Sequence, residues 1–323
     1  MQNKFNVLII GAGKIGAFFD SPMSPETLTH AHAFSKHRGF NLIGFYDLDY
    51  KKAQRAAKLW KVKSFRSLAD TFTENRIDII SVAVPDNSHY QVLKEIIQYH
   101  PKFVFAEKPL TTLFSSSRKI VNLFQKNKIP LLVNYSRRFV PEFIELKKEI
   151  DRKTYGKFLG GIGYYGKGIL HNGSHLINLL KYYLGKIQII DVIKSEKDFY
   201  DKDPSTTVIL KINSDQRFFL QHINCQNYSI FEIDLLFEKG RLRIVDSGFV
   251  IEKYNVKESP SFKGYYSLVG RKIVKTSFNQ ALYHAVNHIF NVLNNKDKLL
   301  CPAEEASEDV KLCLTISKKA INA

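Results

Sequence analysis

The 323 residues, 44% hydrophobic and 24% charged, have the balance of a globular protein long enough for two domains. The net charge of +17 admits nucleic acid or small anionic ligands as partners, but the basic residues are scattered, with no zinc-finger spacing or RNA-binding aromatic signature. No apolar run approaches the roughly 20 residues of a membrane span, and three distant cysteines, Cys225, Cys301 and Cys313, argue against a disulfide framework. Because the N-terminus also shows no secretory pattern, we expect a cytoplasmic protein without a membrane or nucleic-acid partner.

A short apolar strand, Phe5–Ile10, is followed at once by the sequence G-x-G-x-x-G and then by a helical pattern. In such a turn Gly11 allows the tight bend, Gly13 lets a pyrophosphate approach the backbone, and Gly16 lets helix and strand pack closely. The helix N-terminus offers free N–H groups to the phosphates. We therefore expect a dinucleotide to bind at Gly11, Gly13, Lys14, Ile15 and Gly16.

The first helix is interrupted by the turn-rich segment 20–25, and a second helical stretch runs from about residue 28 to residue 36. His30, His32 and His37 cluster there. A metal site is one interpretation, but no cysteine or carboxylate spacing completes it. We expect no metal and a helix that faces the surface or the substrate.

The second predicted strand, residues 41–46, ends at Asp47. A carboxylate at this point holds ribose hydroxyls and repels a 2′-phosphate, which favours NAD(H) over NADP(H). The alternative is that Asp47 or Asp49 merely caps the following helix. Asp49 fits the cap better, which would leave Asp47 free for the ribose.

Strands and helices alternate up to about residue 135, which predicts a doubly wound parallel sheet, a Rossmann domain over residues 1–134. One buried strand, residues 103–106, ends in Glu107, Lys108 and Pro109. Chemistry in such a sheet lies beyond the carboxyl ends of the strands, so Lys108 stands where a cofactor or substrate would lie. The alternative is that Glu107 and Lys108 are a solvated strand end.

After about residue 135 the regular alternation of strands and helices ends. From residue 187 to about residue 252 the pattern is mostly strands without helices between them, which is typical of antiparallel pairing. Helical patterns over 278–294 and from 303 onward close the chain. The sequence predicts an α+β second domain, residues 135–323, with a large, mostly antiparallel sheet.

His171 and His175 are four residues apart and share one helix face if the helix has begun. Two such histidines can ligate zinc, but no third ligand is evident. They can also serve as a general base with an orienting partner, or one can be a capping or core residue. A part in proton transfer is the interpretation that we favour for His175.

The glycine turn, Pro85 with His89, the Glu107-Lys108-Pro109 motif and a Gly…His…Gly…His segment over 168–175 occur in this order. Their order and spacing resemble the glucose–fructose oxidoreductase/inositol dehydrogenase/MocA family over essentially the whole chain. The resemblance implies an NAD-dependent oxidoreductase whose C-terminal sheet forms a homodimer or homotetramer. It implies that Lys108 bonds to the reacting oxygen, that His175 accepts the proton, and that Pro85, His89 and Glu107 lie at the cofactor.

Two positions depart from the family pattern. Many members carry an aspartate where this chain has His171, and an acid where it has Asn178. Both departures remove negative charge and fit an anionic substrate. The expected reaction is hydride transfer between nicotinamide and a sugar, with a nucleotide-activated sugar of surface polysaccharide favoured by the basic charge. Two alternatives stay open: an NAD-binding member acting as a non-catalytic sensor or partner protein, and a basic nucleic-acid-binding protein.

Overall fold

The structure, a computed structural model, describes residues 4–213 and 215–321, which form two compact units. The first unit extends to Val140 and takes in Asn279–Val310. The second consists of Pro141–Phe278 and the residues from Lys311 onward. The division at residue 134 that the sequence suggests stays a prediction about folding domains.

The first unit is built on a six-stranded sheet in the order β3-β2-β1-β4-β5-β6, with every neighbouring pair parallel. The predicted doubly wound parallel sheet is confirmed. Its strands are β1 (Phe5–Ile10), β2 (Phe40–Tyr46), β3 (Lys63–Phe65), β4 (Ile79–Val82), β5 (Phe103–Ala106) and β6 (Leu131–Val133). Its helices are α1 (His30–Lys36), α2 (Tyr50–Trp60), α3 (Leu68–Glu74), α4 (His89–Ile96), α5 (Phe114–Lys126) and α8 (Ala281–Leu293).

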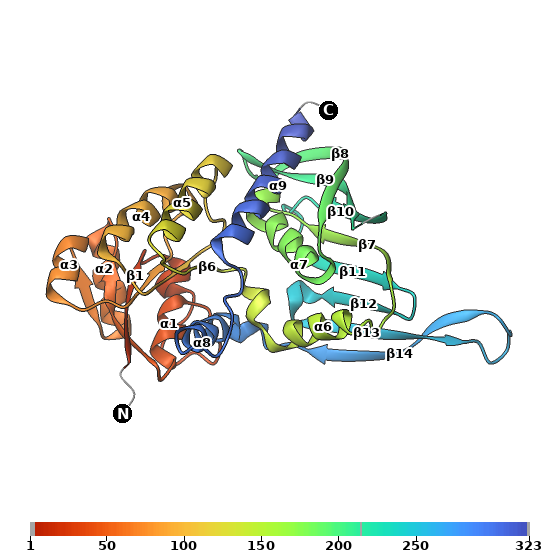
Figure 1. Ribbon diagram of the computed structural model, residues 1–323, viewed down its shortest axis with the longest axis horizontal. Helices are drawn as coiled ribbons and strands as arrows, with labels where there is room; N and C mark the ends of the chain where they lie inside the picture. Colours follow the sequence, from red (N-terminus) through yellow and green to blue (C-terminus); the bar gives the residue numbers. More distant parts are fainter. Residues whose placement is uncertain (1–3, 214, 322–323) are drawn as a thin grey trace. The chain divides into compact units, whose positions relative to one another are not determined.

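The burial of the central strands of this sheet explains why their sequences are apolar. Every residue of β4, β5 and β6 is buried, as parallel strands covered by helices on both faces must be. Figure 1 shows α4 beside α5 and α1 beside α8. Helix α8 comes from the far end of the chain, yet its buried residues Leu282, Val286 and Ile289 complete the same hydrophobic core.

The second unit is built on an eight-stranded sheet in the order β14-β13-β12-β11-β7-β10-β9-β8. All neighbours are antiparallel except β7 and β10, so the mostly antiparallel sheet is confirmed. The strands are β7 (Phe158–Tyr165), β8 (Ile187–Tyr200), β9 (Asp203–Ile212), β10 (Gln216–His222), β11 (Phe231–Phe237), β12 (Gly240–Val245), β13 (Val250–Glu258) and β14 (Tyr266–Lys275). The helices are α6 (Pro141–Asp151), α7 (Ser174–Leu184) and the later part of α9 (Ala303–Ile321).

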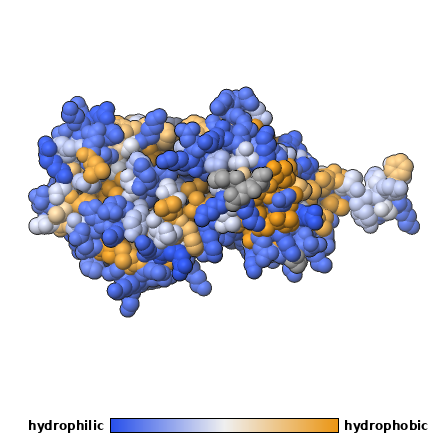
Figure 2. Space-filling model, turned by 90° about the horizontal axis from the view of Figure 1, so that it is seen from above, coloured by the Kyte–Doolittle hydropathy of each residue, from blue (hydrophilic) through white to orange (hydrophobic). Residues whose placement is uncertain are grey.

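Glycines in β7 let α7 pack tightly on one face of this sheet. A Cβ atom at Gly163 would lie 2.7 Å from a methyl carbon of Leu176 on α7. The side chains of Phe219 and Leu236 point the other way, and each is more than two-fifths exposed. Figure 2 shows hydrophobic side chains gathered on the surface of the second unit. This sheet therefore has one helix-covered face and one open face with apolar side chains.

One feature of the second sheet was not predicted. Strand β14 lies beyond residue 252, where the strand pattern was expected to end, and it pairs with β13 in a hairpin whose far end extends from its unit (Figure 1). Most residues of β14 are exposed, so no alternation of apolar and polar residues marks it. Within the described residues, no helix has both the length and the apolar character needed to cross a membrane.

Candidate functional site

The register of the parallel sheet brings the residues predicted at the cofactor to one edge. The last residues of β1, β2, β4, β5 and β6 pair side by side. The residues that come next, Gly11, Asp47, Glu107 and Asn134, therefore leave the sheet at the same carboxyl edge. In an open α/β sheet this edge is where ligands bind.

The three glycines of the turn serve different needs. Gly11 has φ of 100°, and a Cβ there would lie 2.5 Å from the carbonyl oxygen of Ala83. A Cβ at Gly16 would overlap the carbonyl oxygen of Gly11. At Gly13, by contrast, a Cβ would meet no described atom within 4 Å. Packing within the protein thus leaves Gly13 unexplained, and open space at this point fits the approach of a pyrophosphate to the backbone.

The helical turn after the glycines is short. It covers only Lys14–Phe18 and has π-helical geometry, with Lys14 exposed and Ile15 half-buried. The chain then folds back on Asp20, whose carboxylate accepts hydrogen bonds from the amide of Leu28 at 2.6 Å and from His32 at 2.8 Å. This turn therefore offers an anion its local N–H groups and no long helix dipole.

Asp47 is already engaged with the glycine turn. Its Oδ2 accepts a hydrogen bond from the amide of Ala12 at 2.7 Å, and its Oδ1 accepts one from the amide of Asp49 at 2.9 Å. The predicted cap is confirmed, because Asp49 accepts from the amide of Lys51 at the start of α2. Asp47 is not free as expected, but a carboxylate accepts about four hydrogen bonds, so it retains capacity for ribose hydroxyls.

A buried network surrounds Glu107. Its carboxylate accepts hydrogen bonds from Nε2 of His30 at 2.9 Å and from Nδ2 of Asn134 at 2.6 Å. Nδ1 of the same ring lies 2.6 Å from the hydroxyl oxygen of Ser81. Burial by itself raises the pKa of Glu107, but these hydrogen bonds and the nearby charges of His30 and Lys108 outweigh it, so the pKa lies below its usual value.

Asn134 also carries an unsatisfied atom. Its side chain is buried, and Oδ1 has no hydrogen-bond partner among the described residues. A buried acceptor of this kind is costly unless a ligand or water satisfies it. Its place at the carboxyl edge of the sheet gives a second observation that fits a bound cofactor.

The expectation that His30, His32 and His37 lie on a surface helix is wrong, and the alternative that this helix faces a substrate stays a prediction. All three side chains are buried, and each has a separate polar partner: Glu107, Asp20 and Asn287, respectively. The described residues contain no group of three or more histidines, cysteines and acids able to hold a metal ion. These pairs could not be predicted from the sequence, because partners such as His30 and Glu107 are 77 residues apart.

Lys108 follows Glu107 directly and is half-buried, and its peptide bond to Pro109 is cis. His89, at the start of α4, is buried between two loops: Nδ1 lies 2.7 Å from the carbonyl oxygen of Pro109 and Nε2 lies 3.0 Å from that of Val84. This ring holds together the loops that follow β4 and β5. Pro85 is exposed, and its carbonyl oxygen accepts the hydrogen bond of the turn that leads into α4.

The predicted histidines of the second unit lie on either side of the start of α7. His171 belongs to a helical turn, Gly168–Gly173, and its Nδ1 lies 2.7 Å from Oδ2 of Asp203. His175 is the second residue of α7, and its ring meets Phe231 edge-on with centroids 6.5 Å apart. Asn178, one turn further along, is buried.

Asp203 corrects one expectation. The sequence suggested that a histidine at position 171 leaves the segment without negative charge, yet Asp203, at the start of β9, supplies a carboxylate next to that histidine. It also accepts hydrogen bonds from the amides of Leu170 and His171, each at 2.9 Å. The sequence analysis missed Asp203 because it lies 32 residues further along the chain, in a region that shows only strand patterns.

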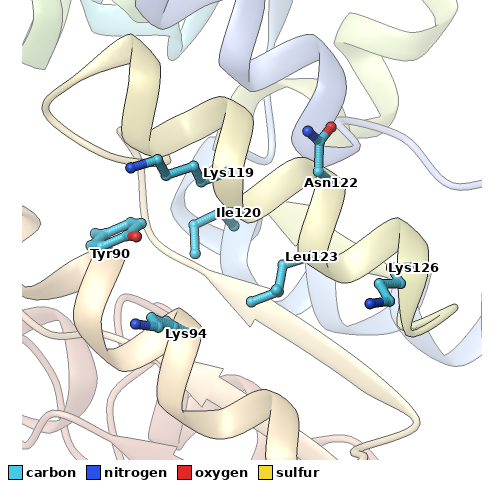
Figure 3. A pocket seen from close by; sticks show the side chains of 7 residues that line it. All are labelled: Tyr90, Lys94, Lys119, Ile120, Asn122, Leu123 and Lys126. Atoms are coloured by element: carbon cyan, nitrogen blue, oxygen red, sulfur yellow. The ribbon is translucent and has the colours of Figure 1, made fainter.

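A separate groove lies between α4 and α5. Figure 3 shows lysines from both helices around Tyr90 and the side chains of Ile120 and Leu123. The lining residues are Tyr90, Lys94, Lys119, Ile120, Asn122, Leu123 and Lys126, around a volume of about 320 Å³. None of the predicted site residues is among them, and we assign this groove no part in the site.

Comparison with known proteins finds a family model that matches part of the first unit. Residues 5–135 match the model of the GFO_IDH_MocA family, described as an oxidoreductase family with an NAD-binding Rossmann fold. Among curated proteins, inositol 2-dehydrogenase of Corynebacterium glutamicum (strain R) is 28% identical over 161 residues, 49% of this chain and 44% of that protein. The chain thus spans less than half the length of this curated relative.

Solved structures extend the likeness of fold to the whole chain. The WlbA dehydrogenase of Bordetella pertussis, in complex with NADH and UDP-GlcNAcA, has a TM-score of 0.76 at 16% identity, covering 98% of this chain and 97% of its own. A variant of KijD10, a 3-ketoreductase of Actinomadura kijaniata in complex with TDP-benzene and NADP, has a TM-score of 0.76 at 13% identity, covering 98% of both chains. At such identities the likeness concerns the fold.

Proposed function

We propose that this chain, whose residues 5–135 belong to the glucose–fructose oxidoreductase/inositol dehydrogenase/MocA oxidoreductase family, is an NAD-dependent dehydrogenase or reductase of a sugar or sugar derivative. Residues 1–134 would hold the cofactor and residues 135–323 the substrate. The observation that carries the proposal is that three features lie at one carboxyl edge of the parallel sheet. These are the open space at Gly13, the carboxylate of Asp47 and the Glu107-Lys108 pair.

The proposed cofactor is NAD(H). The backbone from Gly11 to Gly16 would bind the pyrophosphate, and Asp47 would accept from the ribose hydroxyls. When bound, the nicotinamide supplies the hydride chemistry. Similar folds occur with NADH and with NADP, so the choice rests on Asp47, whose carboxylate would repel a 2′-phosphate. Pro85 and His89 would shape the loop at the cofactor.

The proposed catalytic residues are Lys108, His175 and His171. The Lys108 ammonium would hydrogen-bond to the reacting oxygen of the sugar and stabilise the charge that develops on it. The burial and hydrogen bonds of Glu107 fix the backbone from which Lys108 extends. The resemblance to the family supports His175 as proton acceptor, with His171 near the substrate.

A nucleotide-activated sugar is the proposed substrate class, as used in making surface polysaccharide. Its support is the net charge of +17 and the fold shared with WlbA, whose structure contains UDP-GlcNAcA. A diphosphate would carry the anionic character suggested by the sequence. The carboxylate of Asp203 beside His171 gives no support to an anion at that histidine.

We further propose that the chain forms a homodimer or homotetramer through the open face of its second sheet. On this face Phe219 of β10 pairs with Ile162 of β7, and Leu236 of β11 pairs with Gly160 of β7, so exposed apolar side chains lie on neighbouring strands. Arg217 and Asp234 lie in the same two rows, so the face is mixed in character. Exposed apolar surface of this kind is typical of protein interfaces.

The experiment that tests the cofactor site uses Gly13→Val, because no described atom would touch a Cβ at Gly13. We expect the variant to keep the melting temperature of the wild type and to lose NAD binding, measured by calorimetry, by about 10²-fold or more, since the side chain fills the space of the pyrophosphate. Gly16→Ala is the contrast, because its Cβ overlaps Gly11 and should destabilise the fold. Unchanged NAD affinity in Gly13→Val would contradict the proposed site.

The alternative function is an NAD-binding sensor or partner protein that performs no chemistry. It shares the cofactor site and predicts the same loss in Gly13→Val. It differs in predicting that no sugar exchanges a hydride with the bound nicotinamide.

A further inference from the structure

The hairpin of β13 and β14, residues 250–275, carries large apolar side chains that its own unit does not cover. We call this hairpin the arm. Phe262, Tyr265 and Tyr266 at its far end are 67%, 72% and 68% exposed, and Leu268 and Ile273 on β14 are 42% and 53% exposed. Figure 1 shows the far end of the arm extending from its unit, and Figure 2 shows hydrophobic surface at the outer end of this projection. Exposed apolar side chains gathered in this way indicate a surface that a partner covers.

Hydrogen bonds fix the turn at the end of the arm. The amide of Ser259 donates to the carbonyl oxygen of Tyr265 at 2.7 Å, and the amide of Tyr265 donates to that of Phe262 at 3.1 Å. Gly264, with φ of 84°, donates its amide hydrogen to the carboxylate of Glu258 at 2.6 Å. The rings of Phe262 and Tyr265 meet edge-on with centroids 6.2 Å apart. The turn therefore presents its aromatic side chains together, from a backbone of defined geometry.

The arm also carries an excess of positive charge. Its two acids are already engaged, because Glu252 pairs with Arg271 and Glu258 accepts from the turn. One of its lysines, Lys253, pairs with Glu149 at 2.7 Å. The remaining four lysines are exposed and form no ion pair with any described residue: Lys257, Lys263, Lys272 and Lys275. The arm thus combines an aromatic end with four lysines whose charge no side chain of the described residues balances.

The charge and the side chains of the arm favour one kind of partner over two others. A second copy of this chain brings a net charge of +17, so like-charge repulsion opposes its contact with the four lysines. Nucleic acid is anionic, but its bases stack on aromatic rings and gain little from aliphatic side chains such as Leu268 and Ile273. An anionic lipid surface accommodates all three features: aromatic rings at its interface, aliphatic side chains in its apolar layer and lysines at its headgroups.

We propose that the arm binds the surface of an anionic lipid membrane. The rings of Phe262, Tyr265 and Tyr266 enter the boundary between headgroups and acyl chains, and the four lysines contact anionic headgroups. Such binding needs no spanning segment, so it is compatible with a chain whose apolar runs are too short to cross a membrane. None of the residues proposed for catalysis or cofactor binding belongs to the arm, so this inference stands independently of the proposed function.

The test measures co-sedimentation of the full chain with lipid vesicles. One set contains phosphatidylcholine alone, and the other contains phosphatidylcholine and phosphatidylserine in equal parts. We expect binding to the phosphatidylserine vesicles to be tighter by about 10²-fold or more, because each lysine near an anionic surface contributes about fivefold. Added salt should weaken this binding, since it screens the attraction. No binding to either set, or equal binding to both, would overturn the proposal.

Two variants of the arm locate the binding, and a third is the matched control. Replacing the three aromatic residues together by serine should weaken vesicle binding by about tenfold or more and keep the melting temperature, because these side chains are exposed. Replacing the four lysines by glutamine should abolish the preference for phosphatidylserine. The control replaces four exposed basic residues of α2 by glutamine and so removes the same charge from another surface: Lys51, Lys52, Arg55 and Lys58. It should keep vesicle binding, and an equal loss in the control would show an effect of net charge alone and overturn the proposal.

The same proteins distinguish the other two partners. Light scattering without lipid should give the wild type and the aromatic variant the same mass. A lower mass for the variant would show that a second copy of this chain covers the arm. Duplex DNA of random sequence, added at the same salt, should bind less tightly than phosphatidylserine vesicles. Tighter binding of DNA that is lost in the arm variants would identify nucleic acid as the partner, and either of these two results would overturn the proposal.

Discussion

Replacing His30 by leucine tests the buried network from which Lys108 extends. The change removes the donor that lies 2.9 Å from Glu107, and the hydrogen bond from Asn134 at 2.6 Å remains. Both members of the pair are buried, with side-chain exposures of 0% and 11%. Removing one partner of such a pair typically costs about 3–5 kcal/mol, because a charge stays buried without compensation. In a unit of this size each kcal/mol lowers Tm by about 2–4 °C, so we expect a drop of roughly 6–20 °C.

The loss of stability in His30→Leu should also depend on pH in a definite direction. In the wild type the pKa of Glu107 is lowered below 4.5, so its contribution to stability is present above the unfolded-state pKa and is lost as pH falls through the folded-state pKa. Without His30, burial dominates and the pKa of Glu107 rises. Protonation then relieves the buried charge, so the Tm gap between variant and wild type should narrow as pH falls.

The assay is a thermal melt of the full chain at a series of pH values. His37→Leu is the matched control, because His37 is also buried but bonds to the neutral amide of Asn287. Its Tm gap should not follow the protonation of Glu107. A His30→Leu variant that melts within about 2 °C of the wild type, less than 1 kcal/mol, would refute the reasoning. So would a gap that stays constant with pH.

Two further predictions concern the cofactor and the assembly. Asp47→Ala should weaken NAD binding and reduce the preference for NAD over NADP, both measured by calorimetry. The reason is that the variant loses the carboxylate that would accept from the ribose hydroxyls and repel a 2′-phosphate. Equal affinity of the unchanged protein for both cofactors would contradict this prediction. Phe219→Glu should dissociate the oligomer in light scattering, because it places a new charge beside Ile162 on the open face and would bury that charge in an interface. Tyr228→Glu, at an exposed position outside the strands, should leave the oligomer intact. An unchanged mass for Phe219→Glu would remove this face from the interface.

Much of the fold could be predicted because its signals are local. Strands buried on both faces, such as β4 and β5, are uninterrupted apolar runs, and the glycine turn follows β1 without a gap. Strand β14 gave no signal, because an exposed strand is under little pressure to alternate. The place of α8 in the first core depends on packing between residues far apart in the chain.

The residues of the candidate site also divide into those with a local sequence signal and those that depend on a distant partner. Gly13, Asp47 and Lys108 were predicted because their roles follow from their position at the end of a strand. The pairing of His30 with Glu107 and of Asp203 with His171 was not predicted, because the partners are 77 and 32 residues apart, respectively. A lone buried carboxylate or histidine has the same sequence signature as an exposed one, so only the fold distinguishes them.

The central claim is hydride transfer with a sugar, and the most direct measurement follows nicotinamide absorbance in mixtures of the pure protein, cofactor and candidate substrates. The panel includes inositol, free hexoses and UDP-sugars with NAD, and the matching keto-sugars with NADH. We predict turnover of at least one of these, lowered by about 10²-fold in Lys108→Met with NAD affinity retained. NAD binding without hydride exchange in either direction, or a folded Lys108→Met variant as active as the wild type, would contradict the account.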